Sequence, residues 1–132
     1  MDRAKKALEF HSKGYNCAQA VLCAFSDVTD FNEDQLFRLS EAFGFGMGTQ
    51  GVCGAVSAMV FLAGLKRSLG LSNLPNTNKK ESYKLARELI EEFNLKNQSV
   101  ICKEIKENNL RSCDGCIEDA VRILEEKLNL KK

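Results

Sequence analysis

The sequence predicts an all-α fold: a single-domain helical bundle of about five to seven helices over residues 1–132, around a central apolar helix. Apolar residues recur at helical spacing, and no run rich in Val, Ile and Thr alternates with a period of two as a strand would. The chain contains one proline, the residue that most strongly breaks helices. A length of 132 residues suits one domain with its own hydrophobic core.

Three helices are expected before the glycine-rich segment at residues 44–54, each begun by a residue that can cap the free N–H groups of its first turn. Asn32 is followed three residues later by Gln35, the spacing of a capping box. Gly14 and Gly44 are expected to end the first and third helices, because glycine accepts the backbone conformation found just after a helix. The expected helices are residues 2–13, 16–25 and 32–43, capped by Asp2, Asn16 and Asn32, and the buried stripe of the third comprises Leu36, Leu39, Ser40 and Phe43.

The fourth helix, expected at residues 53–69, is apolar almost all round, which is typical of a helix that other helices surround. Its apolar run at 52–65 is shorter than the roughly 20 residues of a membrane span, so no membrane partner is expected. Residues 70–78, GLSNLPNTN, have the strongest loop composition in the chain. Further helices are expected at residues 79–94, 100–105 and 114–128.

Charge and cysteine content narrow the class of protein. The net charge is +1, from 19 Lys and Arg against 18 Asp and Glu, which argues against nucleic-acid binding because such proteins usually carry a strongly basic face. The six cysteines are a smaller share than the roughly 8–10% of a disulfide scaffold, and the N-terminus MDRAKKALEFHSKG lacks the apolar region of a secretory signal. We therefore expect a reducing cytoplasm, where thiols serve as metal ligands, redox groups or core residues.

Four of the six cysteines are expected in the first turn of a helix: Cys17, Cys53, Cys113 and Cys116. A helix N-terminus carries about half a positive charge and free N–H groups, which stabilise a thiolate over a thiol. This placement favours reactivity or metal binding over the alternative that cysteine packs as a small apolar residue. Cys23 faces another side of its helix from Cys17 and is expected to be a packing residue.

Cys113 and Cys116 form a CxxC pair, which can chelate a metal or close a small disulfide ring. The sequence lacks the βαβ pattern of a thioredoxin-like site and the second CxxC of a zinc ribbon, and it has Ile117 where a c-type haem site needs histidine. A metal site would therefore combine separated cysteines. Its expected ligands are Cys17, Cys53, Cys102 and either Cys113 or Cys116, which suit Zn²⁺ or an iron–sulfur cluster.

The segment at residues 44–54 holds five of the chain's nine glycines. Gly46, Gly48 and Gly51 have the GxGxxG spacing of a dinucleotide site, but a helix rather than a strand precedes them, which argues against a nucleotide. We expect these glycines to bind a cofactor by letting backbone N–H groups approach Cys53 or a cluster sulfide. A tight turn between helices is the alternative. His11, the only histidine, falls on the inward face of the first helix, where a core role is more common than metal binding.

The chain resembles the redox-active proteins named for their C-GCAxxG-C-C cysteine pattern. The segments that carry the resemblance are GYNCAQAVLCAF (14–25), GFGMGTQGVCGAVSAMVFLAGL (44–65), Cys102 and CDGCIEDAVRILEE (113–126). The resemblance implies redox activity, with Cys17, Cys53, Cys102 and Cys113 as the signature cysteines, and Cys116 is close enough in sequence to take the place of Cys113. Where such proteins carry a glycine after the second cysteine, this chain has Ala58, a departure that puts close helix packing there in question. The resemblance names no substrate.

The leading hypothesis is a redox-active protein whose separated cysteines form one site for electron transfer, as ligands of a metal or an iron–sulfur cluster or as a dithiol. It would exchange electrons with a redox partner protein that the sequence does not identify, and its apolar fourth helix is compatible with a homodimer. One alternative is a thiol–disulfide oxidoreductase with Cys113 and Cys116 as catalytic residues. The other is a structural or interaction module whose cysteines are inert and buried.

Overall fold

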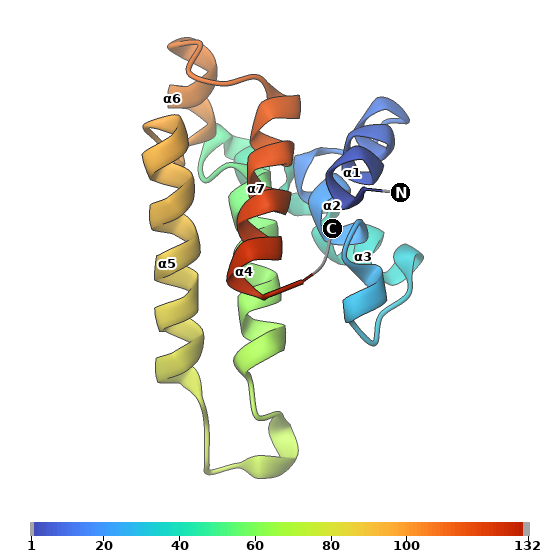
Figure 1. Ribbon diagram of the computed structural model, residues 1–132, viewed down its shortest axis with the longest axis vertical. Coiled ribbons are helices and arrows are strands. Elements are labelled where there is room, and N and C mark those ends of the chain that lie inside the picture. The colour runs from blue at the N-terminus through green and yellow to red at the C-terminus, as the bar shows by residue number, and fades with distance from the viewer. Residues whose placement is uncertain (1, 131–132) are drawn as a thin grey trace.

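The computed structural model describes residues 2–130 of the chain, so Met1, Lys131 and Lys132 of the predicted domain lie outside the described residues. Over residues 2–130 it contains seven α-helices and no β-strand, which confirms the predicted all-α bundle (Figure 1). None of these helices is long and apolar enough to cross a membrane. The helices are α1 (Arg3–Ser12), α2 (Cys17–Cys23), α3 (Glu33–Ser40), α4 (Gly54–Arg67), α5 (Lys79–Asn97), α6 (Cys102–Glu107) and α7 (Cys113–Lys127), and the shorter segments are η1 (Ser26–Val28), η2 (Glu41–Phe43), η3 (Gly46–Gln50) and η4 (Leu71–Asn73).

The central helix of the bundle is α4, as predicted. It packs against α2, α5 and α7, and its buried side includes Met59 and Leu62. Ala58, on the same helix, is also buried in the core. Figure 1 shows α4 and α5 as an antiparallel hairpin with α7 alongside, while α1, α2 and α3 gather on the other side of α7. The hydrophobic core therefore lies between the α4–α5 hairpin and the three N-terminal helices.

Side-chain caps fix where four of the helices begin. At α1, the side chain of Asp2 accepts from the N–H of Ala4 at 3.1 Å, as predicted. At α2, the side chain of Asn16 accepts from the N–H of Gln19 while the Gln19 side chain accepts from the N–H of Asn16, both at 2.9 Å. Asn32 and Gln35 form the predicted capping box at α3. Ser112 accepts an N–H from the first turn of α7, which starts that helix one residue earlier than expected. Each cap satisfies N–H groups that would otherwise lack a partner.

Several helix ends differ from the expected ones. The observed ends are Cys23 for α2, Ser40 for α3, Arg67 for α4 and Asn97 for α5, against expected ends at residues 25, 43, 69 and 94. The chain leaves α4 because Ser68 adopts extended backbone, and α5 continues until Gln98 takes a left-handed conformation with φ of 66°. The short helix expected at 100–105 begins at Cys102, since Ile101 is extended.

Two apolar side chains expected inside the bundle are exposed. The prediction for Leu39 is wrong: it is 45% exposed, because α3 packs on α2 over a narrow strip that contains Leu36 and Ser40. On α4, Leu65 is 41% exposed and Phe61 is half-buried, because the neighbouring helices leave that side of α4 uncovered. The central helix is therefore enclosed on the sides facing α2, α5 and α7 and open on a fourth.

Candidate functional site

Five of the six cysteines line a single cavity of about 40 Å³. A space of this size holds about three water molecules. The five come from four separate parts of the chain: Cys17, Cys53, Cys102, and the pair Cys113 and Cys116. The fold thus brings together every cysteine that the sequence marked as a candidate metal ligand or catalytic residue.

Each cavity cysteine lies at or near the N-terminus of a helix. Cys17, Cys102 and Cys113 are the first residues of α2, α6 and α7, Cys53 is the N-cap residue of α4, and Cys116 lies one turn into α7. The sequence pattern indicated this for all of them except Cys102, whose helix begins later than expected. Helix N-termini place partial positive charge beside the cavity, which stabilises thiolates.

A glycine lets the starts of α2 and α4 meet. Gly54 is the first residue of α4, and a Cβ atom there would lie 3.0 Å from the backbone nitrogen of Ala18 and 3.1 Å from the carbonyl oxygen of Phe43. A side chain normally does not tolerate so close a contact. Because glycine has no side chain, α2 and α4 can approach closely here, which brings Cys53 and Cys17 to the same cavity.

Backbone hydrogen bonds join the start of α4 to the start of α6. The N–H of Cys53 donates to the carbonyl of Val100, and the N–H of Cys102 donates to the carbonyl of Gly51, both at 2.7 Å. Val52 and Ile101 face each other between these two bonds as an antiparallel bridge. This short pairing places Cys53 and Cys102 at neighbouring positions of the cavity wall.

The environment of Cys53 favours its thiolate. A hydrogen bond from the thiol of Cys116 lowers the pKa of Cys53 to about 7, against the opposing effect of burial. The backbone N–H groups of Ala55 and Val56 in the first turn of α4 and the ammonium group of Lys106 act in the same direction. At neutral pH Cys53 is therefore ionised to a greater extent than an ordinary cysteine.

Three of the other cavity thiols, Cys17, Cys102 and Cys116, hold their protons more tightly. Burial raises the pKa of Cys17 and of Cys102, and neighbouring cysteines raise that of Cys17 further. The hydrogen bond that Cys116 donates to Cys53 raises the pKa of Cys116, and burial adds to this. Cys17 in turn donates to Cys113. The cavity thus combines the readily ionised sulfur of Cys53 with three thiols whose pKa is raised.

The glycine-rich turn contributes in part to the cavity. Gly46 lines it, whereas Gly48 and Gly51 lie outside its wall. A Cβ atom on Gly46 would lie 2.5 Å from the backbone nitrogen of Gly51, and the N–H of Gly51 donates to the carbonyl of Gly46 at 2.9 Å. These two glycines close the turn, and the N–H groups that stabilise Cys53 come from α4. The cofactor-binding role of the three glycines stays a prediction.

Besides Gly54, four residues of the wall were not identified as site residues from the sequence: Phe45, Ile105, Lys106 and Arg111. Phe45 has left-handed backbone with φ of 52° and is 54% exposed. The Lys106 ammonium lies 5.2 Å from the centre of its ring, within the range of a cation–π contact. Lys106 is one of 19 cationic residues in the chain, and no local pattern distinguishes it. Only the placement of α6 reveals its role beside the cysteines.

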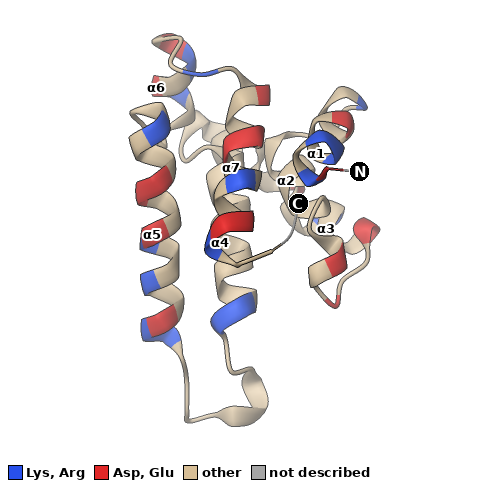
Figure 2. Ribbon diagram, in the orientation of Figure 1, with Lys and Arg blue, Asp and Glu red and all other residues tan. Residues whose placement is uncertain are grey.

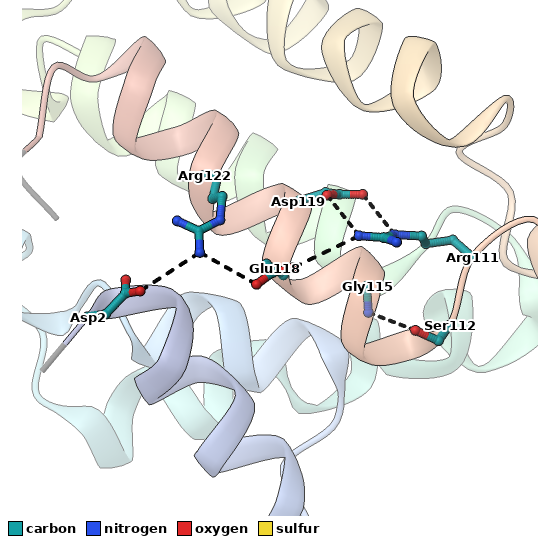
Figure 3. Close-up of polar contacts among 7 residues, drawn as sticks. All are labelled: Asp2, Arg111, Ser112, Gly115, Glu118, Asp119 and Arg122. Atoms are coloured by element: carbon teal, nitrogen blue, oxygen red, sulfur yellow. Dashed lines mark hydrogen bonds and ion pairs between the residues drawn. The ribbon is translucent and has the colours of Figure 1, made fainter.

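Polar contacts fix α7, the helix that carries two of the cavity cysteines (Figure 3). The guanidinium of Arg111 contacts the carboxylate of Asp119 through Nε at 3.2 Å and Nη2 at 3.3 Å. Gly115 makes room for it, since a Cβ atom there would lie 2.4 Å from Nε of Arg111. Further along α7, Arg122 lies 3.8 Å from the carboxylate of Asp2 at the start of α1. These contacts hold the first turn of α7 against the cavity.

Two residues singled out in the sequence lie outside the cavity wall. His11 is 29% exposed rather than buried in the core, because its Nδ1 pairs at 2.6 Å with Oδ1 of Asp114 at the start of α7. Cys23 is fully buried, which confirms the expected packing position. Its thiol contacts the carbonyl of Glu33 at 3.6 Å, and burial, with the nearby Glu33 carboxylate, raises the pKa of Cys23 to about 12.

The donor atoms of the cavity suit soft metals. Thiolate sulfur is the protein ligand of iron–sulfur clusters and a frequent ligand of Zn²⁺. All six cysteines are free thiols. Among residues 2–130, no three His, Cys, Asp or Glu side chains are already arranged to hold one metal ion. The residues present therefore fit a sulfur-ligated group by their chemistry, and binding would require their side chains to rotate.

Comparison with known proteins adds one match. The family model described as "Putative redox-active protein (C_GCAxxG_C_C)" matches residues 15–127. This range includes all six cysteines and every segment that lines the cavity. Searches of curated proteins and of solved structures gave no match.

Proposed function

The chain belongs to the C_GCAxxG_C_C family of putative redox-active proteins, and on that basis we propose that its five clustered cysteines are its redox centre. The observation that carries the proposal is the meeting of five thiols from four chain segments at one small cavity. A protein that used cysteine only as a small apolar core residue would have no need to gather them, because such residues can pack anywhere in a core.

The first form of this centre is a sulfur-ligated metal site. Its ligands would be Cys17, Cys53, Cys102 and Cys113, with Cys116 as a fifth donor that can replace Cys113. A bound iron–sulfur cluster would supply one-electron transfer, and a bound Zn²⁺ would supply a structural anchor. The chain's own part is to provide the thiolates and to release their protons, since ligand sulfurs bind metal in the deprotonated form. Helix N-termini and Lys106 offset the negative charge that gathers there.

The second form is a dithiol that cycles with a disulfide, and the hydrogen bond between Cys116 and Cys53 favours this pair for it. The Cys53 thiolate would attack a disulfide of a partner protein and release one partner thiolate. Cys116, after losing its proton, would then attack Cys53 in the mixed disulfide, which leaves a Cys53–Cys116 disulfide and a fully reduced partner. Two electrons pass to the partner in this sequence. The pairing differs from the Cys113–Cys116 pair suggested by the CxxC motif.

Elemental analysis of the whole chain, purified without oxygen, tests the proposal. Stoichiometric iron with acid-labile sulfide supports a cluster, and stoichiometric zinc supports a zinc site. The metal should be lost from the Cys17→Ser, Cys53→Ser and Cys102→Ser variants. Cys23→Ala is the matched control, because this sixth cysteine lies in the core away from the cavity, and it should keep the metal.

If the purified protein contains no metal, the next test concerns the chemistry of the thiols. The dithiol form then requires a Cys53–Cys116 disulfide that forms and breaks reversibly at a measurable potential, detected by mass spectrometry in a series of redox buffers. If the chain carries no metal and no cavity pair oxidises reversibly, the redox-centre proposal is wrong, and the cysteines are packing residues.

A further inference from the structure

Exposed apolar side chains gather at the turn between α4 and α5. Leu69, Leu71 and Leu74 are 46%, 83% and 58% exposed, and they are flanked by Leu65 at the end of α4 and Tyr83 at the start of α5, at 41% and 58%. We call Leu69, Leu71 and Leu74 the leucine tip. Figure 1 shows this turn projecting from the end of the α4–α5 hairpin opposite to α6. A cluster of exposed apolar residues of this kind marks an interaction surface.

Positive charge surrounds the leucine tip. Residues 68–78 contain no charged side chain, and two cations lie on each side of them, Lys66 and Arg67 before and Lys79 and Lys80 after. No acidic residue occurs from position 66 to position 80. Figure 2 shows the same arrangement, with an uncharged turn between basic positions at the ends of the two helices. Glu81 follows Lys80, and Asp30 lines a pocket together with Lys66, so four cations and two acidic residues lie around the leucine tip. An apolar surface with this excess of positive charge complements a bilayer with anionic headgroups over an apolar interior.

The backbone of the turn is hydrogen-bonded within itself. The N–H of Asn73 donates to the carbonyl of Gly70 at 3.3 Å, and the N–H of Leu74 donates to the carbonyl of Leu71 at 3.2 Å. The side chain of Asn78 donates to the carbonyl of Arg67 at 2.6 Å, which ties the two ends of the turn together. Polar groups that already have partners lose less on leaving water, so the turn can approach an apolar phase at low cost.

We propose that the leucine tip binds the surface of an anionic lipid membrane. The three leucines enter the boundary between headgroups and acyl chains, and the four cations contact the headgroups. This is a surface contact and involves no spanning helix, and it departs from the expectation that the protein has no membrane partner. Since α4 has 14 residues, about 21 Å of helix separates the tip from the cysteine cavity. The cavity would therefore face away from the membrane.

A second copy of the chain is the competing occupant, and charge argues against it. A two-fold symmetric interface places the same surface patch of both copies together. Centred on the leucine tip, such an interface would bring two sets of four cations close to each other, and Asp30 and Glu81 of each copy would offset only half of that charge. Repulsion between like charges would oppose the dimer, whereas the same charges attract anionic lipids.

Co-sedimentation with lipid vesicles tests the proposal on the whole chain. The protein should bind vesicles of phosphatidylcholine and phosphatidylserine and should bind vesicles of phosphatidylcholine alone at least tenfold more weakly, because each cation contributes about fivefold near an anionic surface. The double change Leu71→Ser and Leu74→Ser should lower binding at least tenfold. Both side chains are exposed, so the fold does not depend on them. The matched control is Leu95→Ser with Lys96→Gln, at the other end of α5, where Leu95 is 72% exposed.

Tryptophan fluorescence supplies a second readout, because the chain contains no tryptophan. Emission from Leu71→Trp should shift to shorter wavelength on adding the anionic vesicles, and emission from Leu95→Trp should not. Equal loss of binding in the tip and control variants would overturn the proposal, as would binding that phosphatidylserine does not strengthen. A dimer in light scattering that the tip variant dissociates, without vesicle binding by the unmodified protein, would also overturn it and assign the surface to a second copy.

Discussion

Removal of the Cys116 thiol should make Cys53 a weaker acid. The hydrogen bond from Cys116 is the largest influence that lowers the pKa of Cys53 to about 7 from its ordinary value of 9.0. Without it, burial opposes what Lys106 and the N–H groups of α4 contribute, so the pKa should rise towards its ordinary value. At pH 7 each unit by which the pKa rises lowers the ionised fraction of Cys53 by up to about tenfold.

The assay is the rate of alkylation by iodoacetamide as a function of pH in reduced, metal-free protein. Tryptic cleavage after Arg38 and Lys66 gives a peptide in which Cys53 is the only cysteine, so mass spectrometry reads this site alone. The quantity compared is the pH at half-maximal rate. Because this midpoint is taken within each variant, differences in access to the buried sulfur cancel.

Three variants make the result decisive. Cys116→Ala should move the midpoint up by up to about two pH units, while Cys116→Ser, which keeps a donor at the same position, should move it far less. Cys102→Ala enlarges the same cavity without removing a donor to Cys53 and should leave the midpoint near 7. An unchanged midpoint in Cys116→Ala, or an equal shift in Cys116→Ser, would refute the assignment of the low pKa to this hydrogen bond.

Three further predictions concern stability. Gly54→Ala should lower the free energy of unfolding by about 1–3 kcal/mol in urea titration, since the new Cβ meets the backbone of α2. Gly64→Ala lies on the same helix with open space around the new Cβ, so this variant should raise the free energy of unfolding by about 0.5–1 kcal/mol. Asn16→Ala should cost about 1 kcal/mol through loss of the cap of α2, measured in the same way, and no loss would show that the capping box does not fix this helix. Between pH 9.0 and about 12 the folded chain keeps the proton of Cys23 while the unfolded chain releases it, so the free energy of unfolding should fall as pH rises through this range, and less steeply in Cys23→Ala. Identical slopes for the two proteins would contradict the burial effect.

The helices themselves follow from local features of the sequence. Asn32 with Gln35 marked the start of α3, and the apolar composition of residues 53–69 identified α4 as the central helix. Helix ends were less well predicted, because they depend on where packing stops. Leu39 shows the limit: its spacing is that of a buried position, but α3 packs too narrowly to cover it.

The candidate site, like the fold, could be predicted from the sequence only in part. Helix starts were enough to indicate four of the five cavity cysteines, all except Cys102, because the charge at a helix N-terminus is a local property. The sequence could not pair Cys116 with Cys53, add Lys106 and Phe45 to the wall, or place the tip at the far end of the hairpin from the cavity. Those relations arise from contacts between residues distant along the chain. They are decided when Gly54 lets α4 meet α2 and when backbone bonds join Cys53 and Cys102 to their neighbours, since only packing in three dimensions brings such groups within reach of each other.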